Sequence, residues 1–294
     1  MRRKPDRTEP KPLVGFVGQG VVGKHLADDF EKRGLNVLRY GLQRKYRANI
    51  EKIGTCDVVF ICVPTPMTPK GFDVSAIEES LTLVGRGKIA VIKSTVLPGT
   101  TKRLQSIFQE LILLCSPEFL SATTAANDAA KPFSNIVGLP LPSRRHSKAA
   151  QLVNSILPEA PFRQICRSDE AELIKYAHTL HGYTQVLTFN LLYDAATCVD
   201  ASWEKVRAAV QADPMISRYY VDPLHKGGRG AGGACFLKDF SAFSRFYEDT
   251  VARSEGIGFL RAAEAANVAL LKESHKDIDI IANVYGSDRS RSTS

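Results

Sequence analysis

A cysteine within a glycine-rich segment is the clearest candidate for chemistry in this chain. Residues 227–239 read GGRGAGGACFLKD, so Cys235 follows five glycines and precedes Asp239 by four residues. The pattern turns helical after the glycines, so Cys235 falls near a helix N-terminus, where unpaired N–H groups and the helix dipole favour a thiolate. Asp239 shares a helix face with it, and glycine backbone permits close approach of a ligand. We therefore predict a nucleophilic thiolate with an acid–base partner, the alternative being a buried structural cysteine.

A second glycine pattern follows an apolar strand near the N-terminus and opens a helical pattern. In that context GxGxxG is typical of a dinucleotide site, with the pyrophosphate on the helix N-terminus. The predicted cofactor-binding loop consists of Gly18, Gln19, Gly20, Val21, Val22 and Gly23.

The acid that usually holds the adenosine ribose is missing at the end of the second strand. Tyr40 and Gly41 occupy the candidate positions, and Arg39, Arg44 and Lys45 lie nearby. Such a cluster either accepts the 2′-phosphate of NADP or forms a solvated run of surface charge. These residues therefore leave the preferred form of the dinucleotide open, and the expected cofactor is NAD with NADP not excluded.

Short apolar segments alternate with helical patterns as far as residue 167. We predict strands at 13–17, 36–40, 57–63, 88–93, 111–115, 135–139 and 162–166, and helices at 20–33, 73–84, after Pro98, and at 143–156. Residue Asp73 is the expected N-cap of the second helix. From residue 169 the pattern is mostly helical, over 169–199, 202–211 and 235–285.

This order predicts an α/β protein with an N-terminal Rossmann-type doubly wound parallel sheet followed by an all-helical central domain. We expect a disordered arm over 1–12, a dinucleotide-binding Rossmann domain over 13–167, a helical central and dimerisation domain over 168–285, and a disordered tail over 286–294.

Composition excludes several other classes of protein. The 294 residues carry a net charge of +8, but no Lys/Arg cluster is interleaved with aromatic side chains, so we expect no nucleic-acid partner. No apolar run reaches the ~18 residues of a membrane span, and no signal-peptide pattern follows the basic N-terminus. Six cysteines without CxxC or zinc spacing indicate a reducing, cytoplasmic location and no metal. We expect His178 and His181, which lack a third ligand, to be packing or surface residues.

Five short motifs, in this order along the chain, resemble the UDP-glucose/GDP-mannose dehydrogenase family. They are VFICVPTP at 59–66, IKSTVLPGTT at 92–101, SPEFL at 116–120, AELIK at 171–175 and the segment 227–239. The resemblance implies an NAD(P)-dependent nucleotide-sugar dehydrogenase that oxidises the C6 alcohol of a UDP-sugar to a carboxylate in two hydride transfers. A thiohemiacetal and then a thioester would form on Cys235, and the central helices would pair two subunits in a homodimer.

The resemblance also implies roles for individual residues. Cys235 matches the nucleophile, Lys175 the lysine that steadies the oxyanion, Asp239 the aspartate that handles protons or positions water, and Thr95 and Glu118 groups that position water and substrate. The implied cofactor contacts beyond the glycine loop are Val63, Pro64, Thr65, Thr95 and Lys238. The implied substrate contacts are Glu118, Phe119, Leu120, Lys175, Thr179, Gly232 and Gly233.

Four departures from the family pattern qualify these roles. Ala122 replaces a glutamate implicated in thioester hydrolysis, Thr179 replaces an asparagine, and Arg229 and Ala231 replace an aromatic–glycine pair. Arg229 either binds phosphate or is solvated. The family continues into a second α/β domain beyond about residue 285, so we expect the uridine-binding half of the substrate site to be absent unless a partner chain completes it. The competing expectations are a single two-electron oxidation of a smaller substrate, or a non-catalytic dinucleotide-binding paralogue.

Overall fold

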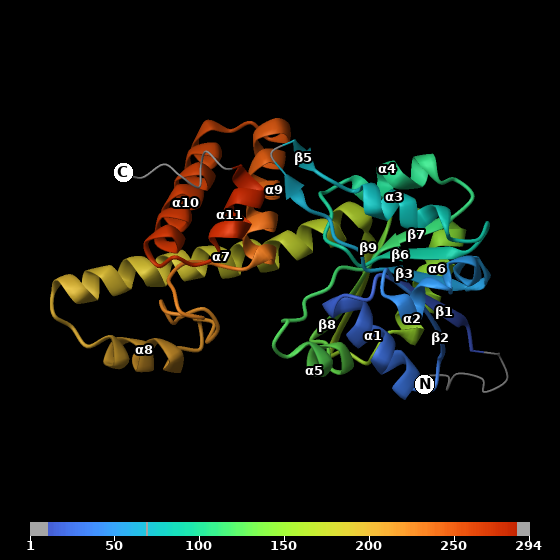
Figure 1. Cartoon of the computed structure of the whole chain (residues 1–294), viewed down its shortest axis with the longest axis horizontal. Coiled ribbons are helices and arrows are strands. Elements are labelled where there is room, and N and C mark those ends of the chain that lie inside the picture. Colours follow the sequence, from blue (N-terminus) through green and yellow to red (C-terminus); the bar gives the residue numbers. More distant parts are fainter. Residues whose placement is uncertain (1–10, 69, 287–294) are drawn as a thin grey trace. The chain divides into compact units, whose positions relative to one another are not determined.

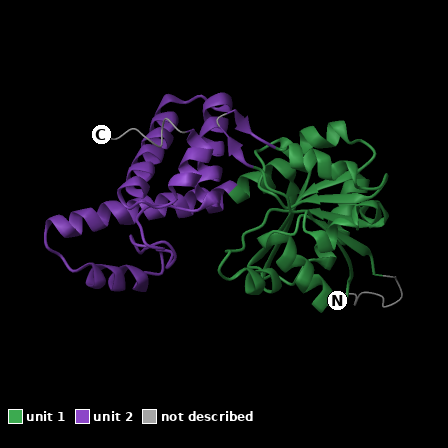
Figure 2. Ribbon diagram, in the orientation of Figure 1, with its two compact units in different colours: residues 1–65, 74–175 green, residues 66–73, 176–294 purple. Residues whose placement is uncertain are grey.

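The computed structural model describes residues 11–68 and 70–286, so most of the predicted arm and tail lies outside the described residues. The chain forms two compact units (Figure 2). Unit 1 holds the residues up to 65 and residues 74–175, and unit 2 holds residues 66–73 and the residues from 176 onward.

Unit 1 is built on a seven-stranded sheet in the order β2-β1-β3-β6-β7-β8-β9 (Figure 1). The strands are β1 (Leu13–Val17), β2 (Asn36–Tyr40), β3 (Val58–Ile61), β6 (Ile89–Ile92), β7 (Ile112–Cys115), β8 (Ser134–Leu139) and β9 (Phe162–Arg167). The predicted doubly wound sheet is confirmed, and its described strand pairs are parallel with one exception.

The exception is the pair β7–β8, which is antiparallel and meets only at Cys115 and Gly138. Helix α5 (Ala125–Ala130) lies between the two strands and has six residues. The connection over residues 116–133 does not return the chain to the opposite edge of the sheet, so β8 starts at the edge where β7 ends.

Helices cover both faces of this sheet (Figure 1). Helices α1 (Val21–Lys32), α5 and α6 (Arg144–Ile156) pack on one face, where Phe16 and Phe60 stack at 5.0 Å and Phe30 of α1 meets both rings. The other face carries η1 (Ile50–Thr55), α3 (Ser75–Thr82) and α4 (Thr100–Ile107). Alternate residues of each central strand face opposite layers, as strand geometry requires, so the sheet forms a rigid core. A short helix, α2 (Arg44–Arg47), follows β2.

Unit 2 is helical, as predicted, with a small hairpin that we did not anticipate. Its elements are α8 (Trp203–Ala212), α9 (Ala234–Thr250), α10 (Ser254–Glu273), α11 (Ile278–Tyr285) and the hairpin β4 (Met67–Thr68) and β5 (Gly71–Phe72), together with most of α7 (Ser168–Cys198). Tyr183 of α7 stacks on Phe240 of α9 at 3.8 Å in its core. Helix α7 begins in unit 1, so the domain boundary near 167 stays a prediction. Within the described part of the chain, no helix is long and apolar enough to cross a bilayer.

One predicted helix N-cap is wrong, because the N-cap of α3 is Val74 and not Asp73. Helix α4 begins at Thr100, after Pro98 as predicted, and no side chain of its own caps it. A distant carboxylate serves it instead. Glu172 of α7 accepts hydrogen bonds from the Gly99 N–H at 2.6 Å and from the Thr101 N–H at 2.8 Å. It therefore satisfies helix donors that a local side chain would otherwise cap.

The buried cap at Glu172 makes stability depend on pH. Burial raises the pKa of the Glu172 carboxyl from 4.5 to about 7, while the hydrogen bonds from Thr101 and Gly99 oppose the shift. Between these two values the folded state keeps a proton that the unfolded state loses, so this contribution to stability is lost as the pH rises. We expect the free energy of unfolding of the wild type, relative to Glu172→Gln, to fall by about 3 kcal/mol between about pH 4.5 and about pH 7.5. Urea titrations of both proteins measure this difference, and a constant difference would contradict it.

Candidate active site

The three loop glycines of unit 1 each meet a different requirement. Gly18 has a φ of +91°, and a Cβ there would overlap the carbonyl oxygen of Cys62, while a Cβ at Gly23 would overlap that of Gly18. Gly20 is exposed and precedes α1, and a Cβ added to it would meet no atom within 4 Å. The first and third glycines thus permit the tight turn and the close packing, and the second leaves open space at a helix N-terminus. This arrangement fits a bound pyrophosphate.

The end of β2 lacks a carboxylate, and its basic cluster is smaller than the sequence indicated. Arg39 is 9% exposed and forms ion pairs of 2.7 Å with Asp28 and with Glu31. It is therefore neither solvated nor available to a phosphate, contrary to both alternatives considered for it. Arg44 and Lys45 remain exposed in this region.

The other predicted cofactor residues of unit 1 follow the neighbouring strands, whereas Lys238 lies on α9 of unit 2. Thr65 Oγ1 donates to the carbonyl oxygen of Thr95 at 2.7 Å, and Ser94 Oγ donates to that of Val63 at 2.7 Å. These bonds tie the segments after β3 and β6 together, and Pro64 lies between the two bonded positions. Because β1, β3 and β6 are adjacent and parallel, the segments lie at the same sheet edge as the glycine loop. This is the edge at which open α/β sheets bind ligands.

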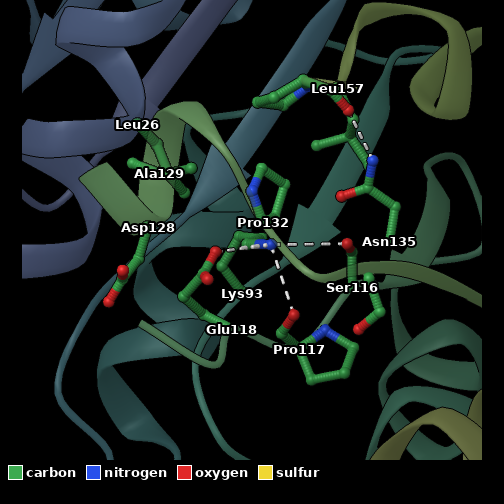
Figure 3. Close-up of a pocket in the computed structure, with 12 residues that line it drawn as sticks. Leu26, Lys93, Ser116, Pro117, Glu118, Asp128, Ala129, Pro132, Asn135 and Leu157 are labelled. Carbon is green, nitrogen blue, oxygen red and sulfur yellow. Dashed lines mark hydrogen bonds and ion pairs between the residues drawn. The ribbon is translucent and has the colours of Figure 1, made fainter. Parts of the chain in front are cut away.

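Glu118 is held by a buried lysine that sequence reasoning did not single out (Figure 3). Lys93 Nζ lies 3.0 Å from Glu118 Oε2, and the side chains are 5% and 12% exposed. Glu118 Oε1 accepts the N–H groups of Phe119 at 2.9 Å and Leu120 at 3.3 Å. Both carboxylate oxygens are thus engaged. The available signal was a lysine directly after an apolar strand, where burial demands a partner.

The buried pair of Lys93 and Glu118 also holds the segment that follows β7, residues 116–120. Lys93 Nζ also donates to the carbonyl oxygen of Pro117 at 3.3 Å and to Ser116 Oγ at 3.5 Å. A cavity of about 10 Å³ beside these groups, lined also by Asp128 and Asn135, has room for about one water molecule. Lys175 Nζ lies over the aromatic ring of Phe119, 5.6 Å from the ring centroid. Unit 1 therefore brings together Glu118, Phe119, Leu120 and Lys175.

In unit 2, Cys235 is exposed and lies in the first turn of α9. The alternative of a buried structural cysteine is wrong. Asp239, one turn further along the helix, is 1% exposed, and Lys238 Nζ lies 2.6 Å from its Oδ1. Thr179 Oγ1 of α7 donates to Asp239 Oδ2 at 3.4 Å. The structure thus brings together Thr179, Lys238 and Asp239, with Cys235 on the same helix face as Asp239.

The structure also shows where two of the residues that depart from the family pattern lie. Ala122 is exposed after the segment 116–120. Arg229 forms an ion pair of 2.7 Å with Asp194 and donates to Asn190 Oδ1 at 2.9 Å, both on α7. Simple solvation is therefore wrong for Arg229, and phosphate binding stays a prediction.

The histidines that we considered on α7, His178 and His181, are both exposed. Among the residues that the structure describes, no group of three or more His, Cys, Asp or Glu side chains is arranged to hold a metal ion.

The chain is similar to known dehydrogenases along most of its length. The sequence model of the UDP-glucose/GDP-mannose dehydrogenase family, NAD binding domain, matches residues 30–156, and that of the family's central domain matches residues 169–269. A UDP-glucose 6-dehydrogenase of Bacillus subtilis is 30% identical over 257 residues, which cover 82% of this chain and 52% of that protein.

The chain is also similar in fold to solved structures of dehydrogenases. A UDP-glucose dehydrogenase of Pyrobaculum islandicum superposes with a TM-score of 0.76 at 25% identity, over 91% of this chain and 72% of that one. A 3-hydroxyisobutyrate dehydrogenase of Mycobacterium tuberculosis shares the fold alone, with a TM-score of 0.68 at 14% identity, over 94% of this chain and 99% of that one.

The chain spans about half the length of the curated relatives that it matches. The two matched segments together cover more than half of the chain and follow the family's order. The first spans β2 to α6 of the sheet unit, and the second spans α7 to most of α10. The chain therefore belongs to the UDP-glucose/GDP-mannose dehydrogenase family, with the NAD-binding domain first and the central domain after it.

Proposed function

We propose that this protein is an NAD-dependent nucleotide-sugar dehydrogenase that oxidises the C6 alcohol of a UDP-sugar to a carboxylate. The observation that carries the proposal is the exposed Cys235 thiol in the first turn of α9, one turn before the buried Asp239. The open Gly20 position at the start of α1 supports dinucleotide binding. The relatives' names, UDP-glucose 6-dehydrogenase among them, support the substrate class.

The chemistry needs a thiol because an aldehyde must become a tetrahedral adduct before it can release a second hydride. NAD supplies the hydride acceptor in both oxidations. The Cys235 thiolate adds to the aldehyde carbon, and the adduct loses hydride to become a thioester. Water then cleaves the thioester, which returns the thiol and releases the acid. In this proposal Lys175 stabilises the oxyanion, Asp239 handles protons, and Thr95 and Glu118 position water and substrate.

A second candidate is a dehydrogenase that performs only one two-electron oxidation, on a smaller substrate. One observation favours it. Ala122 offers no carboxylate for thioester hydrolysis, so an enzyme that formed the thioester would stall there, whereas one that released the aldehyde after the first hydride transfer would need no such group.

A panel of nucleotide sugars, each offered with NAD and with NADP, tests the proposal. The absorbance of the reduced nicotinamide is compared with the amount of sugar consumed. We expect two reduced dinucleotides per sugar and a sugar acid as product. One reduced dinucleotide per sugar would establish the second candidate, and no turnover with any pair would leave a binding protein without this activity.

A homodimer and a cytoplasmic location are further parts of the proposal. Leu191, Leu192 and Val199 of α7 and its following turn are 69%, 46% and 73% exposed, which suits burial against a second copy. The six cysteines are free thiols, as in a reducing compartment. A monomer mass in sedimentation equilibrium, or recovery from a compartment other than the cytoplasm on cell fractionation, would count against these two parts respectively.

A further inference from the structure

The glycine loop before Cys235 is fastened by an asparagine that no motif pointed to. Asn267 of α10 is fully buried, and its carboxamide makes two hydrogen bonds with one residue of the loop. Its Oδ1 accepts the Ala231 N–H at 2.6 Å, and its Nδ2 donates to the Ala231 carbonyl oxygen at 3.0 Å. A side chain that satisfies both backbone groups of a buried residue fixes that residue's peptide planes, since neither group has water as an alternative.

A second fastening acts at the residue that precedes α9. Asp277 Oδ2 accepts the Gly233 N–H at 2.7 Å. Asp277 is itself the N-cap of α11, yet its side chain makes no capping bond there, and its backbone is left-handed with a φ of 54°. The carboxylate therefore serves the glycine loop in place of its own helix. Lys276 Nζ adds a bond to the carbonyl oxygen of Gly230 at 2.9 Å.

These contacts explain most of the loop glycines. A Cβ at Gly232 would overlap the Asp277 carboxylate, and one at Gly228 would come within 2.8 Å of Lys276 Cβ. Gly230 has a φ of +82°, and a Cβ there would lie 3.0 Å from Asn267 Oδ1. These three glycines are thus required by residues 267–277. Gly233 differs from them, because it has a φ of +86° and a Cβ there would meet no atom within 4 Å.

We propose that Asn267 and Asp277 are positioning residues that fix the glycine loop and, through it, the first turn of α9 and the Cys235 thiol. The inference deepens the proposed function, because it rests on Cys235 as the nucleophile. Two fixed points, at Ala231 and Gly233, lie four and two residues before the thiol. The N-terminus of α9 can then start at one place only, and the thiol keeps one position relative to Asp239.

Hydrogen–deuterium exchange of the 294-residue chain tests whether Asn267 and Asp277 fix the glycine loop, an arrangement that we call the clamp. The measurement needs no substrate. We expect peptides covering residues 229–237 to exchange about tenfold faster in Asn267→Ala and in Asp277→Ala. Asn267→Asp, which keeps the acceptor but loses the donor, should fall between wild type and Asn267→Ala. Asp277→Asn, which keeps an acceptor oxygen, should restore nearly wild-type exchange. The control is Asn135→Ala, which removes a buried side-chain hydrogen bond to the carbonyl oxygen of Pro158 in unit 1 and should leave residues 229–237 unchanged.

The turnover rate then shows whether Asn267 positions the Cys235 thiol or only stabilises the fold. With a nucleotide sugar that the wild type oxidises, we expect kcat to fall about 10- to 100-fold in Asn267→Ala. The KM for NAD should change much less, because Lys238 is the one proposed cofactor contact on α9 and the others lie in unit 1. Wild-type exchange rates in Asn267→Ala would overturn the clamp, and fast exchange with unchanged kcat would overturn the positioning role. If the wild type oxidises no nucleotide sugar, the proposed function fails while the exchange rates still decide the clamp.

Discussion

Replacement of Cys235 by serine is expected to reduce the oxidation of the nucleotide sugar to its acid about a thousandfold or more, as removal of a catalytic nucleophile generally does. A serine hydroxyl stays protonated near neutral pH and adds poorly to a carbonyl without an activating base. Residue 235 is exposed in the first turn of α9, so the substitution should leave the fold intact and the loss should arise from the chemistry. Steady-state rates and product analysis measure the effect.

The chain provides its own matched control for this experiment. Cys198 ends α7, and it is also an exposed free thiol. We expect Cys198→Ser to keep wild-type turnover and to remain sensitive to inactivation by a thiol-alkylating reagent. Equal turnover in Cys235→Ser and Cys198→Ser would remove Cys235 from the chemistry and with it the proposed mechanism.

Sequence reasoning located the parts of the site that depend on local pattern. The glycine spacing at 18–23 follows a strand and precedes a helix, and both elements form where apolar periodicity put them. The same holds for Cys235, since a glycine segment before a helical pattern leaves little choice about where α9 begins. Local rules suffice here because the turn and the helix start are made by neighbouring residues.

Partners from distant elements were beyond such reasoning. Lys93 and Glu118 are 25 residues apart in the sequence, and Asn267 reaches Ala231 across 36 residues. From the sequence, Arg39 was assigned to a basic cluster with Arg44 and Lys45. In the structure it is neutralised by ion pairs with Asp28 and Glu31 of α1. The hairpin β4–β5 also escaped notice, because strands of two residues carry no periodicity and this pair is supported by contacts with α9, such as Lys238 Nζ at 5.5 Å from the Phe72 ring.

The buried pair of Lys93 and Glu118 leads to the second large prediction, which concerns stability. Lys93→Met keeps the length and apolar character of the lysine stem but leaves the Glu118 carboxylate buried without its cation. We expect a loss of about 3 kcal/mol in the free energy of unfolding, because an uncompensated buried charge costs more than the pair contributes. The matched control is Lys88→Met, at the other end of β6. Lys88 pairs with Asp57 at 2.8 Å with both side chains at least 34% exposed, so its loss should cost less than about 1 kcal/mol.

A double-mutant cycle shows whether the cost arises from the pair. Glu118→Gln alone strands the Lys93 ammonium, whereas Lys93→Met with Glu118→Gln leaves no buried charge in the pair. The double variant should therefore be more stable than the sum of the single losses predicts, by at least about 1 kcal/mol. Urea unfolding followed by far-UV circular dichroism gives each value. Additive losses would mean that the two side chains act independently, and that the segment 116–120 takes its shape from its backbone bonds to Glu118 Oε1 alone. A coupled loss would instead tie the placement of Phe119 and Leu120, the proposed substrate contacts, to the lysine at the end of β6.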